Sequence, residues 1–417
     1  ASDIKWLARA FANGKPSCII QGTNAIDQQA NGIQTMRAMA VLQAITGNYD
    51  IPGTWVRCPI IRMTDLRLPL SEEPMGADKY PLFYNIWGRT FPYGQGLSFP
   101  DIALSGEPYP IKSFFGLAVN WAVTFPEAPR FVKALKKMDF VAIMDVVMNE
   151  TAELADIVLP AKTFLEKPSF AYTYGVVQGI PYVMSKKKAV EAPGECRSEY
   201  DVLRELALRM GLEQYFPWKD DEEAIDNLLA PSGVGSGVLS DKPSGVYFAE
   251  MEYKTYEQSG FATPSKKVEI YSETLEKAGF DPLPIYSEPT QSAVNTPDLA
   301  KEYPLVLITG SRKSNYTHTQ FHNIPRLRSS LPEPLAEVHP STLARYDIAE
   351  GELVAVETPK GSIKIRAKAD EDLVPGAVSI PHGWAQANAN ELTDLDLRDD
   401  ISGFPQLRGI LCRLRKI

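Results

Sequence analysis

The order of apolar and polar positions divides the chain into an α/β part followed by an all-β part. Residues 139–145 form a strongly apolar run that ends in an acid, Asp145, and predict a buried strand. Apolar runs at 111–118 and 156–160 predict neighbouring strands, and residues 126–137 predict a helix between them. Alternation of this kind is typical of a mainly parallel sheet with helices on its faces.

Two more helices follow from the 3.6-residue spacing of apolar positions. One covers residues 33–44 and stops at Gly47; the other begins after Ser198, a good N-cap residue, and stops at Gly211. Residues 56–108 are rich in Pro, Gly and aromatics without periodicity, which predicts long irregular surface loops. Residues 212–300 read as a connector with small elements.

From Tyr303 onward the pattern is that of short strands separated by turn residues. The predicted strands are 305–308, 353–357, 362–367 and 377–380, with a helical turn at 340–346. Several short strands at such spacing predict a compact β-barrel of roughly 115 residues.

Composition narrows the classes of partner. The chain has 417 residues, 44% of them hydrophobic and 23% charged, as in ordinary globular proteins. Its net charge of −9 argues against nucleic acid as a partner, and without a run of 18 apolar residues we expect no membrane span. The chain starts at Ala1, without an initiator Met or signal-peptide pattern, so we expect a processed or truncated chain. A cytoplasmic and a periplasmic location therefore both stay open.

Cysteine and histidine spacing argues against a metal site within the chain. The four cysteines are far apart: Cys18, Cys58, Cys196 and Cys412. Without a C-x2-C pair they predict free thiols rather than a zinc or iron–sulfur site, or a disulfide framework. His318 and His322 have the i, i+4 spacing of a zinc pair, but the sequence offers no Glu between them and no third ligand.

Polar residues after predicted strands are candidates for ligand binding, because ligands of open α/β sheets collect at the carboxyl ends of the strands. A carboxylate at Asp145 can accept two hydrogen bonds from a guanine, although a helix cap or a solvated strand end is the alternative. Lys167, just past the 156–160 strand, can meet a phosphate or be a surface lysine.

The segment 309–318 is predicted to be a loop that follows a buried strand. Every residue in it except Gly310 carries a hydrogen-bonding side chain, which suits a cradle for a polyanionic ligand, with a solvated surface loop as the alternative. Residues 388–393 and Arg408 supply more polar groups near the C-terminus. The Rossmann, P-loop, nucleophile-elbow and kinase motifs are absent from the sequence.

Read together, these segments resemble the second half of the molybdenum or tungsten bis-pyranopterin enzymes of the dimethyl sulfoxide reductase family. The resemblance is carried by residues 31–53, 144–167, 193–195 and the segment that starts at Thr309, and Glu150–Pro160 is its most specific block. The branch it resembles most is that of acetylene hydratase, with polysulfide and thiosulfate reductases as neighbours.

The resemblance implies a fold and a domain order. The fold is a three-layer α/β parallel-sheet domain followed by an all-β double-psi barrel. Residues 1–55 would be the tail of an α/β cofactor-binding domain, 56–211 an α/β dinucleotide-binding domain, 212–300 a connector, and 301–417 the barrel that binds the molybdopterin dinucleotide. The implied cofactors are two molybdopterin guanine dinucleotides that hold Mo or W.

The resemblance also implies roles for particular residues. Asp145, with the backbone of Met144, would hold a guanine; Lys167 would meet a phosphate or ribose; Thr309 to His318 would wrap the pterin and pyrophosphate. The implied cofactor-contacting positions are Gln28, Asn120, Met144, Asp145, Lys167, Glu199, Thr309, Gly310, Ser311, Arg312, Asn315, Thr317, His318, Asn390 and Arg408.

Some departures from the family pattern limit what we expect of this chain. The family's iron–sulfur cysteines and metal-ligating residue come before the matching region, and Cys18, in a predicted strand, does not match that ligand. The loop at 174–179 lacks the family's Asn and Arg residues. We therefore expect a cofactor-clamping portion that is inactive alone, with the iron–sulfur cluster in the missing part.

The resemblance implies two partners, and three functional hypotheses stay open. One partner is the rest of the same polypeptide or a separate N-terminal chain, and the other is an iron–sulfur electron-transfer subunit. The leading hypothesis is a molybdopterin-dependent oxidoreductase. The alternatives are part of a non-redox enzyme of the acetylene hydratase type, and a scaffold subunit that docks a separate catalytic chain.

Overall fold

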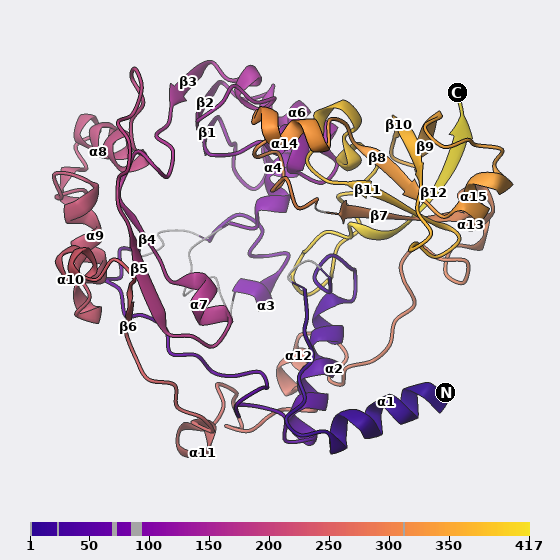
Figure 1. Cartoon of the computed structure of the whole chain (residues 1–417), viewed down its shortest axis with the longest axis horizontal. Coiled ribbons are helices and arrows are strands. Elements are labelled where there is room, and N and C mark those ends of the chain that lie inside the picture. The colour runs from indigo at the N-terminus through magenta and orange to yellow at the C-terminus, as the bar shows by residue number, and fades with distance from the viewer. Residues whose placement is uncertain (1, 23–24, 69–72, 85–93, 312) are drawn as a thin grey trace.

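The computed structural model of the chain describes residues 2–22, 25–68, 73–84, 94–311 and 313–417. Figure 1 shows a small parallel sheet at the top, an antiparallel sheet at the left and a barrel at the right, with the helices nearest the N-terminus below the barrel. Besides the helices that are described with the sheets below, the structure has the α-helices α1 Ser2–Asn13, α2 Gly32–Ile45, α3 Pro81–Phe83, α7 Thr173–Val177, α8 Glu199–Arg209, α11 Tyr256–Ser259, α12 Glu273–Lys277, α13 Pro297–Glu302, α14 Pro325–Ser330 and α15 Pro340–Arg345.

The parallel sheet has three strands in the order β1-β2-β3. They are β1 Ser113–Leu117, β2 Phe140–Asp145 and β3 Ile157–Pro160, and the helices beside them are α4 Phe99–Ser105, α5 Trp121–Thr124 and α6 Ala128–Leu135. Val141 and Ile143 of β2 pack on one face of the sheet against Phe99 and Phe131 of these helices. The apolar run of β2 therefore forms the buried centre of the sheet, as the sequence predicts.

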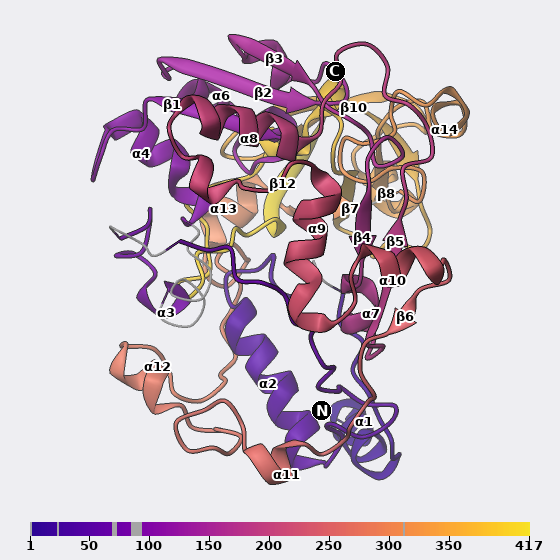
Figure 2. The same cartoon turned by 90° about the vertical axis from the view of Figure 1, so that its left-hand side faces the viewer.

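The second sheet is antiparallel, with β4 Ser169–Ala171, β5 Tyr182–Lys186 and β6 Val246–Tyr247. Val183 of β5 is buried with Leu229 and Leu239 from helices α9 Asp221–Leu229 and α10 Ser236–Asp241. Figure 2 shows these two helices beside β4 and β5, below the parallel sheet. The small elements of the predicted connector thus contribute to a core of their own.

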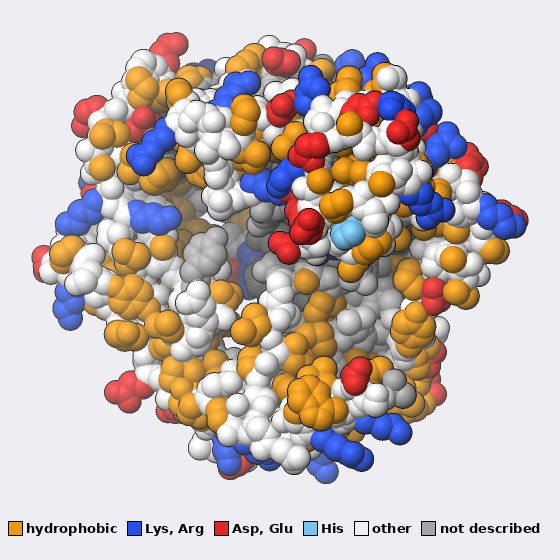
Figure 3. All heavy atoms as spheres, turned by 45° about the vertical axis from the view of Figure 1, so that its right-hand side comes forward, with side chains coloured by type: hydrophobic (Ala, Val, Ile, Leu, Met, Phe, Trp, Pro, Cys, Tyr) orange, Lys and Arg blue, Asp and Glu red, His pale blue; other side chains and the backbone are white. Residues whose placement is uncertain are grey.

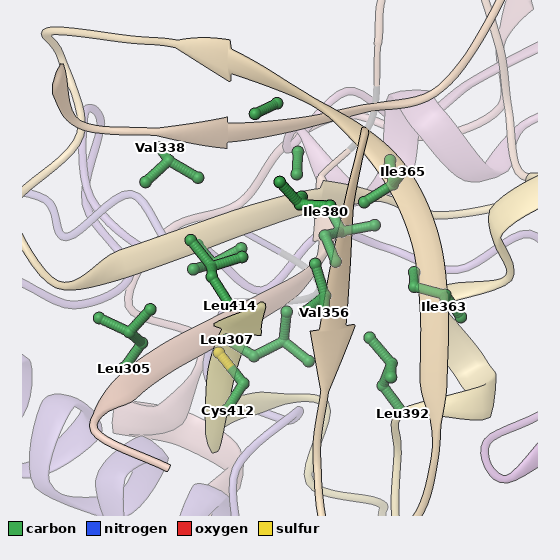
Figure 4. Close-up of a cluster of buried hydrophobic side chains, with 14 of the residues drawn as sticks. Leu305, Leu307, Val338, Val356, Ile363, Ile365, Ile380, Leu392, Cys412 and Leu414 are labelled. Carbon is green, nitrogen blue, oxygen red and sulfur yellow. The ribbon is translucent and has the colours of Figure 1, made fainter. Parts of the chain in front are cut away.

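The barrel is closed by six strands in the order β10-β8-β11-β7-β12-β9. The strands are β7 Leu305–Ser311, β8 Leu335–Val338, β9 Leu353–Glu357, β10 Ser362–Ala369, β11 Ala377–Pro381 and β12 Arg408–Lys416. In β10, buried Ile363, Ile365 and Ala367 alternate with exposed Lys364 and Arg366, as the two-residue period of a strand requires. Figure 4 shows the inward side chains converging on a single apolar interior.

Helix α2 is held to the connector by hydrogen bonds to backbone carbonyls. Gln34 donates to Asp281 at 2.9 Å and Arg37 donates to Pro282 at 2.8 Å. In contrast, none of the α1 residues that the structure describes is buried, and Figure 1 shows α1 at the margin of the molecule.

The fold corrects several sequence predictions. The 56–108 region is not all surface loop, because it contains α4, where Phe99 and Ile102 are buried, and the buried Ile61. Cys18 is not in a strand, since the structure assigns none to residues 17–22. Strand β7 runs on to Ser311, and the barrel strands β8 and β12 were not predicted.

The parallel sheet and the closed barrel are confirmed. The three-layer arrangement, the double-psi topology and the domain boundaries stay predictions. Among the described residues, no helix is long and apolar enough to cross a membrane.

Candidate functional site

Asp145 lies at the carboxyl end of β2, half-buried in the turn that follows. Its carboxylate accepts a hydrogen bond from the backbone N–H of Val146 at 2.6 Å and one from the Asn149 side chain at 2.8 Å. Burial raises the pKa of Asp145, while these bonds and one from the Val147 backbone act in the opposite direction. A carboxylate has about four acceptor positions, so this one retains capacity for another donor.

Asn120 connects the ends of the first two strands of the sheet. Its side chain donates to Glu150 at 2.7 Å and accepts from the Thr151 hydroxyl at 3.1 Å and backbone at 3.3 Å. Met144 is buried, and its carbonyl accepts the Ala118 N–H at 2.9 Å. Both predicted residues therefore build the edge of the sheet next to Asp145.

The structure brings together Lys167 and Glu199, for each of which the resemblance implies a contact with the cofactor. Their side chains form an ion pair. Glu199 is the first residue of α8, and the preceding Ser198 caps the helix by accepting the Asp201 N–H at 3.1 Å. Negative charge is favourable at a helix N-terminus, so this position holds Glu199 beside the lysine.

The predicted loop after β7 is in part strand. Thr309 is buried on β7, and its hydroxyl donates to the Leu407 carbonyl at 2.7 Å, so it faces the protein. Gly310 and Ser311 complete β7, and Arg312 lies outside the described residues. The prediction that 309–311 form a loop is therefore wrong: the ladder between β7, β11 and β12 extends the strand.

The described remainder of the segment, 313–318, folds back on itself. Asn315 donates to the Leu327 carbonyl at 3.1 Å and also bonds to Ser330, while Thr317 is exposed and forms a bridge with Gln320. Lys313 pairs with the buried Glu337 of β8, which ties the start of the segment to the barrel wall. Within the described residues, Asn315 and Thr317 thus bond to residues 320–330 and not to the other predicted cofactor-contacting residues.

His318 and Asn390 meet at His382. The His318 and His382 rings lie 4.9 Å apart in a T-shaped arrangement, and the Asn390 amide nitrogen is 3.5 Å from Nδ1 of His382. The same amide donates to the Val123 carbonyl of α5 at 2.7 Å. A buried Asn390 therefore joins the barrel to the helix beside the parallel sheet.

A second histidine packs against two aromatic rings of the barrel part. The ring of His322 lies 4.3 Å from those of both Tyr316 and Trp384. Burial lowers the pKa of His322, while the negative charge of Glu150 raises it. Tyr316 follows β7 and Trp384 follows β11, so the three rings hold these two barrel loops together.

Gln28 and Arg408 form another pair of predicted residues. Arg408 donates to the Gln28 side chain at 3.2 Å, and the neighbouring Leu407 N–H donates to the Gln28 carbonyl at 3.1 Å. Sequence reasoning missed the flanking Asp27 and Gln406. Each has a buried oxygen, Oδ1 and Oε1 respectively, without a hydrogen-bond partner among the described residues. In the sequence, only their positions close to Gln28 and Arg408 indicate that Asp27 and Gln406 belong to the site.

The site is chemically suited to a nitrogen heterocycle that carries phosphates. The two unpaired acceptors beside Arg408 and the remaining capacity of Asp145 call for N–H donors, which pterin and guanine rings present. Lys167 and Arg408 supply positive charge for phosphates. Figure 3 shows a hollow in one face of the molecule with acidic, basic and histidine side chains at its margin.

The comparisons with known proteins agree with this chemistry. Residues 4–209 match the family described as Molybdopterin oxidoreductase, and residues 305–411 match the Molydopterin dinucleotide binding domain. The chain belongs to the molybdopterin oxidoreductase family. This is the dimethyl sulfoxide reductase family that the sequence resembles.

Individual relatives are similar over nearly the whole chain. Acetylene hydratase of Syntrophotalea acetylenica is 34% identical over 98% of this chain and 62% of its own length. The F420-dependent formate dehydrogenase subunit alpha of Methanocaldococcus jannaschii is 28% identical over 98% of the chain and 60% of its own length. The solved acetylene hydratase from Pelobacter acetylenicus superposes with a TM-score of 0.90 at 31% identity, covering 100% of this chain and 63% of that one. The chain thus spans about three fifths of these relatives.

We expect Asn390→Ala to destabilise the contact between barrel and sheet. The substitution leaves the Val123 carbonyl without its partner in a buried position, which costs about 1–3 kcal/mol. Urea unfolding measures the change. Asn295→Ala, at an exposed asparagine, is the matched control, with an expected change within about 0.5 kcal/mol. Equal effects at both positions would contradict the role given to Asn390.

Proposed function

We propose that this chain is the cofactor-clamping portion of a molybdenum- or tungsten-dependent oxidoreductase that uses two molybdopterin guanine dinucleotides. The observation that carries the proposal is the junction at Asn390, where the barrel part is hydrogen-bonded to α5, directly after the carboxyl end of β1. A dinucleotide needs such a junction, because its guanine and its pterin are recognised at separate points.

The residues of this chain bind and orient the cofactor in this proposal. Asp145 accepts hydrogen bonds from a guanine, and Lys167, positioned by Glu199, meets a phosphate or ribose. Bidentate binding of the guanine requires the Asn149 amide to release its bond to Asp145. Gln28, Arg408, Asp27 and Gln406 surround the other end of the ligand, where the pterin N–H groups meet the two unpaired acceptors.

The cofactor, when bound, supplies the reactive metal held by its dithiolene sulfurs, and the protein supplies binding, orientation and electrostatics. We assign the metal-ligating residue and the iron–sulfur cluster to the part of the protein outside this chain. An iron–sulfur electron-transfer subunit completes the proposed set of partners.

A non-redox hydratase is the second candidate. It is favoured by the 34% identity and the TM-score of 0.90 to acetylene hydratases. Product analysis with the full-length protein separates the two candidates. Aldehyde formed from acetylene without an electron acceptor supports the hydratase, and turnover that depends on an electron donor or acceptor supports the oxidoreductase.

Asp145→Asn is the direct test of the guanine site. We expect the 417-residue chain to bind guanosine diphosphate in preference to adenosine diphosphate, and the variant to bind it at least about tenfold more weakly, because Asn loses a charge-assisted acceptor. Isothermal titration calorimetry measures both affinities. Asp65→Asn, at an acid that pairs with the nearby Arg67, is the control and should leave the affinity unchanged.

The pH dependence gives the same site a second readout. Only ionised Asp145 can accept both guanine donors, and burial raises its pKa. Affinity should therefore fall as the pH falls through this raised pKa, and the fall should disappear in Asp145→Asn. A variant with unchanged affinity and unchanged pH profile would overturn the guanine assignment.

A further inference from the structure

A cavity of about 440 Å³ lies between two segments that are far apart in the chain. One wall consists of residues 57–59, and the other comes from residues 249–255, in the segment that Figure 1 shows between β6 and α11. Cavities of about 300–1,000 Å³ are typical of sites for small molecules. None of the residues for which the resemblance implies a cofactor contact lines this cavity, so the proposed function leaves it without a ligand.

A buried carboxylate holds the two walls of the cavity together. Asp50 is fully buried, and its carboxylate accepts the Arg57 N–H of one wall at 3.0 Å and the Thr255 N–H of the other at 3.1 Å. The Asp50 carbonyl also accepts the Lys254 N–H at 3.0 Å. Because a buried carboxylate is costly unless its hydrogen bonds are kept, these bonds fix one wall relative to the other. The cavity is therefore formed before any ligand binds.

The cavity carries charges of both signs that do not pair with each other. On one wall, Glu250 and Glu252 are exposed, and neither side chain forms a hydrogen bond or an ion pair with a described residue. On the other wall, the Arg57 guanidinium donates from Nη1 to the Ser259 hydroxyl and the Gly260 carbonyl, at 3.4 Å each. Its Nε and Nη2 have no hydrogen-bond partner within the described ranges. Unused donors and unused acceptors thus line the same cavity.

We propose that this cavity binds a small zwitterion of the α-amino acid class, with its carboxylate at Arg57 and its ammonium at Glu250 and Glu252. A guanidinium binds a carboxylate through two parallel N–H donors, which Nε and Nη2 supply. An ammonium has three N–H donors, which two carboxylates can accept. A simple cation would leave the guanidinium unused, and two carboxylates would repel a simple anion. A ligand with both charges therefore fits best, and the inference does not depend on the proposed function.

Three matched small molecules test the requirement for both charges. L-alanine carries both, propionate lacks the ammonium, and ethylammonium lacks the carboxylate. In isothermal titration calorimetry of the 417-residue chain, we expect L-alanine to bind at least about tenfold more tightly than either of the other two, because each of them loses the charge-assisted hydrogen bonds of one wall. Equal affinity for all three molecules, or no binding of L-alanine, would overturn the proposal.

The thiol of Cys58 reports whether the ligand occupies the cavity, because this residue lines it. Burial raises the pKa of Cys58, so its alkylation by iodoacetamide is followed at mildly alkaline pH, where more of the thiol ionises. Saturating L-alanine should slow this alkylation at least about fivefold, since a bound ligand limits access to the thiol. Cys18, which is exposed, is the control within the same chain and should react at an unchanged rate. Peptide mass spectrometry measures both rates, and an unprotected Cys58 would contradict binding in this cavity.

Substitutions on the two walls separate the two ends of the ligand. Arg57→Gln alone, and Glu250→Gln together with Glu252→Gln, should each weaken L-alanine binding at least about tenfold by removing the charge of one wall. Glu371→Gln, at an exposed glutamate between β10 and β11, is the matched control and should leave the affinity unchanged. All the substituted side chains are exposed, so every variant should keep the urea unfolding midpoint of the parent chain. Unchanged affinity in both wall variants would place L-alanine elsewhere and overturn the proposal.

Discussion

Phe131→Ala is expected to lower the free energy of unfolding by about 3–5 kcal/mol, the range for removing a large aromatic side chain from a core. Phe131 is fully buried on α6, and its ring lies within 6.1 Å of the rings of Phe99, Phe114, Trp121 and Phe125. Alanine leaves a cavity at the point where three helices meet the parallel sheet. Urea denaturation, followed by tryptophan fluorescence, measures the loss.

The matched control is Phe115→Ala, on the opposite face of the same sheet. Phe115 is exposed by 37%, so its truncation creates no closed cavity and should cost less than about 1 kcal/mol. A loss of similar size for both variants would contradict the view that the cost at Phe131 comes from its fully buried position.

Gly383→Ala is expected to destabilise the barrel by about 2–4 kcal/mol, through two independent costs. Gly383 has a φ of +92°, which an alanine adopts with strain, and an added Cβ would lie 2.0 Å from the His318 carbonyl oxygen. The His318 backbone must then move, and with it the ring that meets His382. Urea unfolding gives the stability, and hydrogen exchange of residues 313–322 reports the displacement.

Gly376→Ala isolates the strain from the clash. Gly376 has a φ of +91°, but an added Cβ there meets no atom within 4 Å among the described residues. It should cost only the conformational strain, about 1–2 kcal/mol, and leave exchange in 313–322 unchanged. If both glycine variants behaved alike, the close approach of Gly383 to His318 would have no energetic role.

The sequence predicts those elements whose burial in the fold leaves a recognisable pattern of apolar and polar positions. Residues 140–144 are apolar throughout because β2 is central in the sheet, and residues 362–367 alternate because β10 has one face in the barrel. Strands β8 and β12 were missed for a physical reason. In β12, Arg413 and Arg415 are neutralised by Glu357 at 2.8 Å each, and in β8 the buried Glu337 is matched by Lys313 and Lys368. Because these charges are neutralised by partners elsewhere in the chain, the alternation of apolar and polar positions cannot be recognised from one segment alone.

The sequence predicts individual residues of the candidate site but not the contacts between them. Lys167 with Glu199, and Gln28 with Arg408, are joined by tertiary contacts between segments far apart in the chain. The sequence predicts Thr309 in a polar loop with its hydroxyl available to a ligand, whereas in the structure that hydroxyl donates to the Leu407 carbonyl. The remaining assignments depend on the ligand and stay predictions.

The bonds between Gln28 and the strand that begins at Arg408 have a consequence for how this protein can be dissected. The Ile33 N–H also lies 3.3 Å from the Asp399 carboxylate, so the opening segment fastens the closing one at several points. A barrel fragment that begins at residue 301 would lack these hydrogen bonds to its C-terminal segment. A stable minimal fragment must therefore include both ends of the polypeptide, and a circular permutant that joins the two ends would keep the hydrogen bonds within one continuous segment.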